Sequence, residues 1–105
     1  MSTEVRDNPQ EQRFEVVVDG SVAGFADYRQ DDGRIAFTHT EVSDDYAGQG
    51  LAKRLVTHAL DDVAGRDLAV VPLCSYVART IARDRDRYLH LVPEDERGRL
   101  DRDGS

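Results

Sequence analysis

The stretch Ala47-Gly48-Gln49-Gly50-Leu51-Ala52 joins an alternating segment that ends near Val42 to a helical pattern that begins near Leu51. Glycine lacks a Cβ, so its backbone can adopt left-handed conformations and come close to a ligand. The first amides of the following helix have no acceptor within the helix, and they lie at the positive end of its dipole. The stretch therefore predicts a turn that binds an anion, such as a phosphate, at a helix N-terminus.

Two cations, Lys53 and Arg54, follow the glycines in the first turn of that helix. Positive charge is mildly unfavourable there unless an anion occupies the same end, so their placement favours a phosphate ligand. The alternative is an ordinary turn followed by two solvated cations.

Three strands are expected before the glycine turn. The segment Arg13 to Val18 is rich in β-branched residues, and Asp19-Gly20 is a two-residue hairpin signal ahead of a second strand from Val22 to Arg29. A turn at 30–33 leads to a third, alternating strand from Ile35 to Val42. Such short connections predict an antiparallel meander.

After the turn the period changes. Apolar residues recur at helical spacing from Leu51 to a stop near Gly65, Leu68 to Leu73 reads as a strand buried on both faces, and a second helix is expected from Ser75 to about Asp84. A right-handed crossover would lay residues 68–71 parallel to the third strand, and a groove would open where the two strands diverge. The fold class is α/β: a three-stranded antiparallel meander followed by helix, parallel strand and helix.

The two ends of the chain are polar and lack periodicity. Residues 1–12 and 93–105 are expected to be disordered tails, with one domain over 13–92. A chain of 105 residues is long enough for one small core but not for two.

Composition excludes several classes of function. Lysine and arginine total 14 against 21 acidic residues, a net charge of -7 without a basic segment, which argues against nucleic-acid binding. One cysteine cannot form an internal disulfide, and no Cys/His spacing predicts a metal site. No signal peptide is visible, and the apolar runs are far below the ~20 residues of a membrane span. These features predict a cytoplasmic protein without a metal or a membrane partner.

The order of elements, with the strings FTHTEV at 37–42, GQGLA at 48–52 and VPLCSYV at 71–77, resembles the GNAT superfamily of N-acetyltransferases. The three strings are similar to the minimal, single-domain branch of that superfamily. The resemblance implies an enzyme that transfers an acetyl group from acetyl-CoA to an amine of unidentified structure, either a small amine or one on a protein.

The same resemblance implies which residues bind the cofactor. The turn and helix start would hold the pyrophosphate, the end of the third strand and residues 68–73 would flank the pantetheine, and the Leu73 amide would polarise the thioester carbonyl. The cofactor-binding residues expected in this way are Thr40, Val42, Ala47, Gly48, Gln49, Gly50, Leu51, Ala52, Lys53, Leu73, Cys74 and Tyr76. Ala47 departs from the superfamily, which commonly has arginine or glutamine there.

Ionisable residues enter the third strand toward the glycine turn. A period of two puts Ile35, Phe37, His39 and Glu41 on one face, which therefore changes from apolar to ionisable. Either His39 or Glu41 could remove a proton from an ammonium substrate. The alternative is a partly buried histidine with satisfied hydrogen bonds and a solvated glutamate.

Cys74 follows the predicted parallel strand and precedes the second helix, where a helix N-terminus would lower the pKa of its thiol. Three roles stay open for it: a covalent acetyl acceptor, a general acid toward the CoA thiolate, or a wall of the pantetheine channel. In many larger members of the superfamily, a tyrosine on this helix protonates the CoA thiolate. Ala82 occupies that position here, and Tyr76 is the nearest phenol.

These departures keep a second function open, a CoA-binding or protein-interaction module without turnover.

The alternation of Arg79, Arg83, Arg85 and Arg87 with Asp84 and Asp86 predicts a solvated ion-pair surface.

Overall fold

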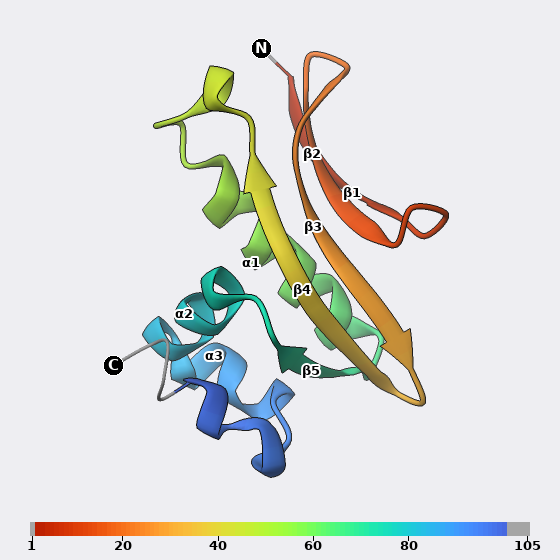
Figure 1. The fold of residues 1–105 in the computed structure, drawn as a ribbon, viewed down its shortest axis with the longest axis vertical. Coiled ribbons are helices and arrows are strands. Elements are labelled where there is room, and N and C mark those ends of the chain that lie inside the picture. The colour runs from red at the N-terminus through yellow and green to blue at the C-terminus, as the bar shows by residue number, and fades with distance from the viewer. Residues whose placement is uncertain (1, 101–105) are drawn as a thin grey trace.

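The computed structural model describes residues 2–100 and contains one five-stranded sheet in the order β1-β2-β3-β4-β5. Its antiparallel strands are β1 (Thr3–Asn8), β2 (Arg13–Val18), β3 (Ser21–Asp31) and β4 (Arg34–Val42), and β5 (Ala69–Pro72) runs parallel to β4 (Figure 1). The predicted meander, crossover helix and parallel strand are therefore confirmed, with one further strand at the N-terminus.

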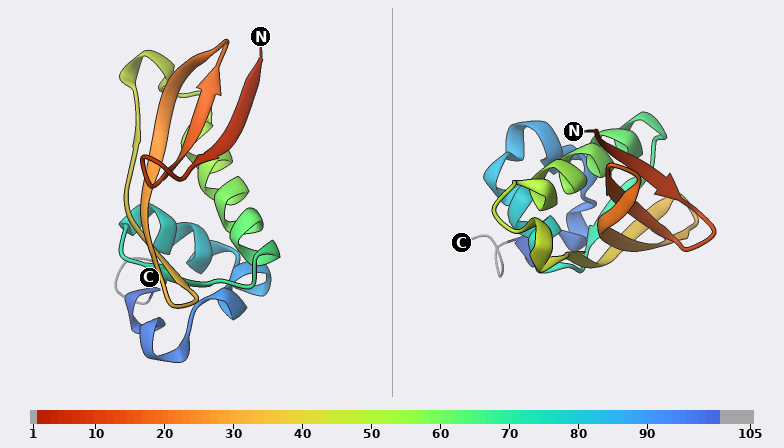
Figure 2. Two further views of the ribbon diagram at one scale, coloured as in Figure 1. Left: turned by 90° about the vertical axis from the view of Figure 1, so that its right-hand side faces the viewer. Right: turned by 90° about the horizontal axis from the view of Figure 1, so that it is seen from above.

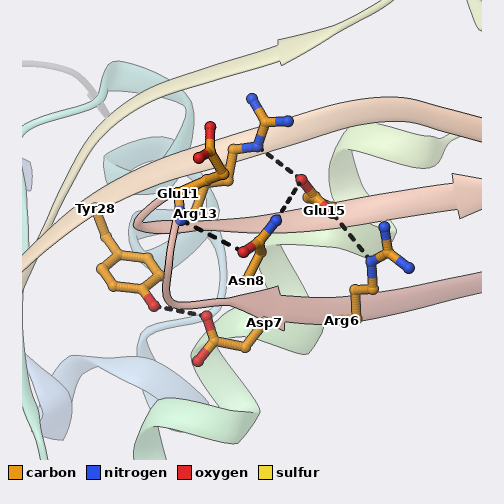
Figure 3. Close-up of polar contacts among 7 residues, drawn as sticks. All are labelled: Arg6, Asp7, Asn8, Glu11, Arg13, Glu15 and Tyr28. Carbon is orange, nitrogen blue, oxygen red and sulfur yellow. Dashed lines mark hydrogen bonds and ion pairs between the residues drawn. The ribbon is translucent and has the colours of Figure 1, made fainter.

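That additional strand corrects the expectation of a disordered segment over residues 1–12. β1 pairs with β2 along its whole length, from Thr3↔Val18 to Asn8↔Arg13. Its polar composition suits an edge strand, because its side chains make ionic contacts instead of filling a core. Arg6 and Asn8 bind the carboxylate of Glu15, whereas Asp7 accepts a hydrogen bond from Tyr28 (Figure 3). Met1 lies outside the described residues.

Helix α1 (Leu51–Gly65) packs along one face of the sheet (Figure 2). Its inner stripe follows the predicted helical spacing and is fully or nearly fully buried, through Leu51, Leu55, Val56, Ala59, Leu60 and Val63. These side chains join Phe14, Ala26, Ile35 and Phe37 of the strands in a single core. The expected helix thus exists with the expected buried face.

β5 lies at the edge of the sheet, and one of its faces is only partly buried. This corrects the expectation that both of its faces are buried. Val70 and Pro72 are buried, but Val71 is only half-buried and Leu73, just after the strand, is 45% exposed. β5 pairs with β4 from Arg34↔Ala69 to Phe37↔Pro72 and then stops, whereas β4 continues to Val42. The two strands therefore part after Phe37.

The C-terminal part contains α2 (Ser75–Arg83), α3 (Arg85–Tyr88) and short 3-10 turns at Leu89–Leu91 and Glu94–Glu96. Leu100 is completely buried in the core, and Arg34 pairs with Asp95 at 3.3 Å. The expectation of a disordered tail over 93–105 is therefore wrong for 93–100, because Leu100 of this segment packs in the core. Residues 101–105 lie outside the described part of the chain.

None of the helices in residues 2–100 is long and apolar enough to cross a membrane. No group of three or more His, Cys, Asp or Glu side chains in this range has a geometry that could hold a metal ion.

Candidate functional site

The glycine turn has an unusual backbone. Gly48 and Gly50 have φ values of 81° and 72°, in the left-handed region where a Cβ is strained. Gly50 is the N-cap of α1 but supplies no side-chain acceptor, and the first turn of the helix contains no acidic residue. The first helical hydrogen bond runs from the Arg54 amide to the Gly50 carbonyl at 3.1 Å. The preceding amides are thus available to an anion.

A hollow of about 190 Å³ lies beside this turn. It is bordered by eight of the residues that sequence reasoning assigned to the cofactor: Val42, Ala47, Gly48, Gly50, Leu51, Ala52, Lys53 and Tyr76. Tyr46 also lines it and was missed, although an aromatic residue directly before a glycine turn was a visible signal. Gln49 belongs to the turn but is exposed and does not border the hollow.

The point after Phe37 where β4 and β5 part, here called the strand break, lies next to Cys74. The Cys74 amide donates to the Phe37 carbonyl at 2.8 Å, at the point where β4 and β5 part. Its Sγ donates to the Thr40 hydroxyl at 3.3 Å, and the residue is 8% exposed as the N-cap of α2. Thr40 and Val42 lie two residues apart on one strand, so the thiol is about 7 Å further along β4 than the hollow.

His39 and Glu41 are not on this side of the sheet, which corrects the predicted face. Asp27 pairs with His39 but Tyr28 pairs with Phe37, so Thr38 is one extra residue in β4. A bulge of this kind reverses which later side chains face the core. Thr40 pairs with the fully buried Ala26 and faces inward.

The two ionisable residues instead form a pair on the opposite face. The Nε2 of His39 lies 3.5 Å from the Oε1 of Glu41, and their side chains are 58% and 62% exposed. The ring of His39 lies 6.1 Å from that of Phe25, which is on the same outer face. Cys74 and the His39–Glu41 pair are therefore brought to the same segment of β4, but from opposite faces.

The Leu73 amide is not free to polarise a carbonyl. It donates to the Val71 carbonyl at 3.1 Å in a tight turn at the end of β5. The expectation for this amide is wrong, because the chain must turn sharply between Pro72 and the N-terminus of α2.

A second and larger hollow, of about 460 Å³, lies between α1 and α2 and shares Lys53 and Tyr76 with the first. Arg79 and Arg83 of α2 border it, although the sequence pattern predicted an ion-pair surface there. Tyr88 borders it as well, with its hydroxyl 3.4 Å from Asp61. Burial and the Asp61 carboxylate raise the pKa of Tyr88, so its phenol stays protonated.

Solved structures share this architecture. A GCN5-like protein from Staphylococcus aureus, determined by NMR, matches 86% of the chain and 87% of its own length with a TM-score of 0.61 and 25% identity. The ribosomal-protein-S18-alanine N-acetyltransferase of Escherichia coli matches 59% of the chain and 42% of its own length, with a TM-score of 0.54 and 26% identity.

A curated relative and a family match complete the comparison. The Protein NATD1 of Gallus gallus is 42% identical over 57 residues, and the match spans about half of each protein, 52%. The sequence model of the GCN5-related N-acetyl-transferase family matches residues 13–91, which include the glycine turn, the strand break and Cys74. The chain therefore belongs to the GCN5-related N-acetyltransferase family.

Proposed function

We propose that the protein is an acetyl-CoA-dependent N-acetyltransferase that moves an acetyl group from CoA to an amine. The observation that carries the proposal is the continuity of the site along β4: uncapped amides of α1 at one end and the buried Cys74 thiol at the other. A ligand that fits must be anionic at the end that meets the α1 amides, and it must have a narrow, reactive arm at the end that meets Cys74. Acetyl-CoA has this form, and its thioester supplies the activated acetyl group.

The amides that follow Gly50 would bind the pyrophosphate. A Cβ added at Gly48 or Gly50 would meet nothing within 4 Å, so the turn stands open for a ligand. Ala47 provides no cationic or amide side chain, so the main chain and Lys53 would make the phosphate contacts.

The open edge of β4 would position the pantetheine. Residues 38–42 extend beyond the last β4–β5 pair, Phe37↔Pro72, and end at the hollow bordered by Val42. Backbone groups along such an edge can pair with the amides of an extended ligand. The thioester would then reach the Thr40–Cys74 pair.

Cys74 is the proposed catalytic residue on the helix side. It is the N-cap of α2, and its hydrogen bond to Thr40 fixes the direction of its Sγ. As a covalent acceptor, its Sγ would bond to the acetyl carbon while the bond to the CoA sulfur breaks and the Cys74 proton leaves with CoA. As a general acid, Cys74 would only give a proton to the CoA sulfur. As a wall of the pantetheine channel, it would form no bond to the acetyl group and transfer no proton.

The His39–Glu41 pair would serve the amine from the outer face. Both side chains are more than half exposed, so an acceptor can reach them. An ammonium group must lose a proton before it attacks the thioester, and either residue can accept that proton. The bulge at Thr38 brings the pair to the strand segment that carries Thr40 on its other face.

The test is CoA release from acetyl-CoA with a panel of small amines, polyamines and lysine peptides. We expect at least one amine to raise release above hydrolysis. Cys74→Ala and Cys74→Ser should both lower kcat if the thiol reacts, and the covalent role predicts an acetylated protein on rapid quenching and mass spectrometry. Unchanged kcat in both variants would leave Cys74 as a channel wall.

The second candidate function is a CoA-binding module without turnover. Ala47 and Ala82 favour it, because each stands where relatives have a functional side chain. It predicts stabilisation by CoA, by about 2.7 kcal/mol at a ligand concentration a hundredfold above Kd, together with no amine-dependent release. Absence of any CoA binding would exclude both functions.

A further inference from the structure

The hollow between α1 and α2 is bordered by three cations that the proposed chemistry does not use. Lys53 comes from α1, and Arg79 and Arg83 lie four residues apart on α2, so that they share one helix face. Among residues 2–100, Asp84 is the only carboxylate on its border, which leaves a formal charge of +2 from three cations and one anion. The protein as a whole carries -7, so this local excess is opposite in sign to the rest of the molecule.

None of these three cations has a carboxylate within ion-pair distance among residues 2–100. Other arginines are paired in the same range, for example Arg66 with Asp7 at 2.9 Å and Arg87 with Asp61 at 2.7 Å. Gathering unpaired like charges around a hollow is unfavourable unless an anion binds between them.

The two threonine side chains on the border do not compete for that anion. The hydroxyl of Thr57 donates to the Lys53 carbonyl at 2.8 Å, and that of Thr80 donates to the Tyr76 carbonyl at 2.9 Å. Both protons are therefore used within their own helices. The guanidinium and ammonium groups are the free charged donors of the hollow, and guanidinium groups bind phosphate oxygens in a bidentate manner.

The position of the hollow limits which part of a ligand can occupy it. Lys53 and Tyr76 border both this hollow and the one at the glycine turn, so the two hollows adjoin. A ligand whose pyrophosphate occupies the turn and whose thiol arm follows β4 has its nucleoside end left over. The α1–α2 hollow is the adjoining space, and its lining extends along α2 from Tyr76 to Asp84, away from the helix end that Cys74 caps. CoA carries a phosphomonoester on its nucleoside end, at the 3′ position.

We propose that Arg79 and Arg83 bind the 3′-phosphate of CoA, so that the protein selects CoA over dephospho-CoA. The inference rests on the proposed function and adds a specificity determinant to it. A phosphomonoester carries nearly two negative charges at pH 7, which matches the local charge of the hollow. Dephospho-CoA would keep the contacts at the glycine turn but would leave both arginines without a partner.

The experiment is isothermal titration calorimetry with CoA and dephospho-CoA, on the full chain and on the double variant Arg79→Gln/Arg83→Gln. Two charge-assisted contacts predict a Kd for CoA at least about tenfold lower than that for dephospho-CoA in the parent. The double variant should reduce this ratio to below about threefold while the Kd for dephospho-CoA stays the same. Raising the salt concentration should weaken CoA binding more than dephospho-CoA binding.

The matched control is Arg29→Gln, which removes an exposed arginine of β3 away from the α1–α2 hollow and should leave the ratio unchanged. Equal affinity for the two nucleotides in the parent would overturn the inference while leaving the proposed function intact. A ratio that survives the double variant would overturn the assignment to these arginines. If neither nucleotide binds, the inference and the proposed function both fail.

Discussion

At the scale of single residues, Gly24 is the glycine of residues 2–100 at which an added side chain would meet the closest contacts. A Cβ placed on it would lie 2.7 Å from the Glu41 carbonyl oxygen and 2.8 Å from the Cγ2 of Val42. β4 can therefore lie this close to β3 only because residue 24 has no side chain. Val42 in turn borders the hollow at the glycine turn, so Gly24 positions one wall of the candidate site.

Gly24→Ala should lower the free energy of unfolding by about 1–3 kcal/mol, because neither the carbonyl nor the Val42 side chain can move without disturbing the β3–β4 pairing. The matched control is Gly65→Ala at the end of α1, where a Cβ meets nothing within 4 Å. That variant should be neutral or slightly stabilising. Urea denaturation of both measures the difference, and equal stabilities would contradict the steric argument.

Glu15 is the one buried charged residue in the described chain, at 1% exposure. Burial by itself would raise its pKa, but hydrogen bonds from Arg13, Arg6 and Asn8 outweigh burial and hold the pKa below its ordinary value of 4.5. The two guanidinium contacts are 2.8 Å and 3.0 Å long (Figure 3). The carboxylate therefore links β1 to β2 in its charged form.

Glu15→Gln should destabilise the protein at neutral pH by about 1–2 kcal/mol. Because the folded pKa is lowered, the stabilisation is fully present above the ordinary carboxyl pKa and is lost as the pH falls through the folded value. The stability difference between the parent and the variant should thus be constant from pH 6 to 8 and shrink below about pH 4.5. A difference that is independent of pH would mean that the charge contributes nothing.

At the scale of elements, the strands and helices with clear periodicity were predictable. β-Branched residues predicted β2, the hairpin signal at Asp19-Gly20 predicted β3, and alternation predicted β4. The helical spacing predicted α1 from Leu51 to Gly65, as observed. β1 was not predictable, because an edge strand stabilised by Arg6, Asp7 and Asn8 has no apolar pattern.

The faces of β4 were predictable only as far as Phe37. The alternation of residues 35–42 is unbroken in sequence, and the bulge at Thr38 exists only in relation to the partner strand. The glycine turn could be predicted because its conformation is local. The α1–α2 hollow could not, since the meeting of Lys53 with Arg79 and Arg83 depends on how two helices pack.

The N-terminus of α1 provides a prediction at this scale. Gly50→Ala places a Cβ at a φ of 72°, which should cost about 1–2 kcal/mol of stability and weaken CoA binding, because relief of the strain would turn the first amides away. Gly20→Ala is the matched control, with a φ of 85° in the β2–β3 hairpin. It should lose similar stability but keep its affinity for CoA. Equal loss of affinity in both would show a global effect instead.

At the scale of the whole molecule, a cluster of polar side chains holds the N-terminal edge of the sheet to the end of α1. The hydroxyl of Tyr28 donates to Asp7 at 2.6 Å, and Arg66 donates to both Asp7 and Asp62, at 2.9 Å and 2.8 Å. Burial, together with the bond to the Asp7 carboxylate, raises the pKa of Tyr28. β1, β3 and α1 are thereby joined at one end, opposite the glycine turn along α1.

Tyr28→Phe should lower the free energy of unfolding by about 1–2 kcal/mol, because the partly buried Oδ1 of Asp7 loses its hydrogen-bond donor. Tyr46→Phe is the control, since the structure shows no hydrogen bond from the Tyr46 hydroxyl to any of residues 2–100, and it should change stability by less than about 0.5 kcal/mol. Thermal or urea unfolding distinguishes the two. Tyr28→Phe should leave the ratio of CoA to dephospho-CoA affinity unchanged, because Tyr28 borders neither of the two hollows.

The extra residue at Thr38 sets which side chains of the last part of β4 face α1 and which face solvent. Substitutions at 39 and 41 can alter the solvent side without disturbing the packing beneath α1, and those at 40 and 42 do the reverse. Deletion of residue 38 would remove the bulge and leave both sets on their present faces, but it would place each of them one position nearer to Phe37 in the sequence. Homologues that differ in chain length at this point should consequently differ in which odd or even positions carry their ionisable side chains.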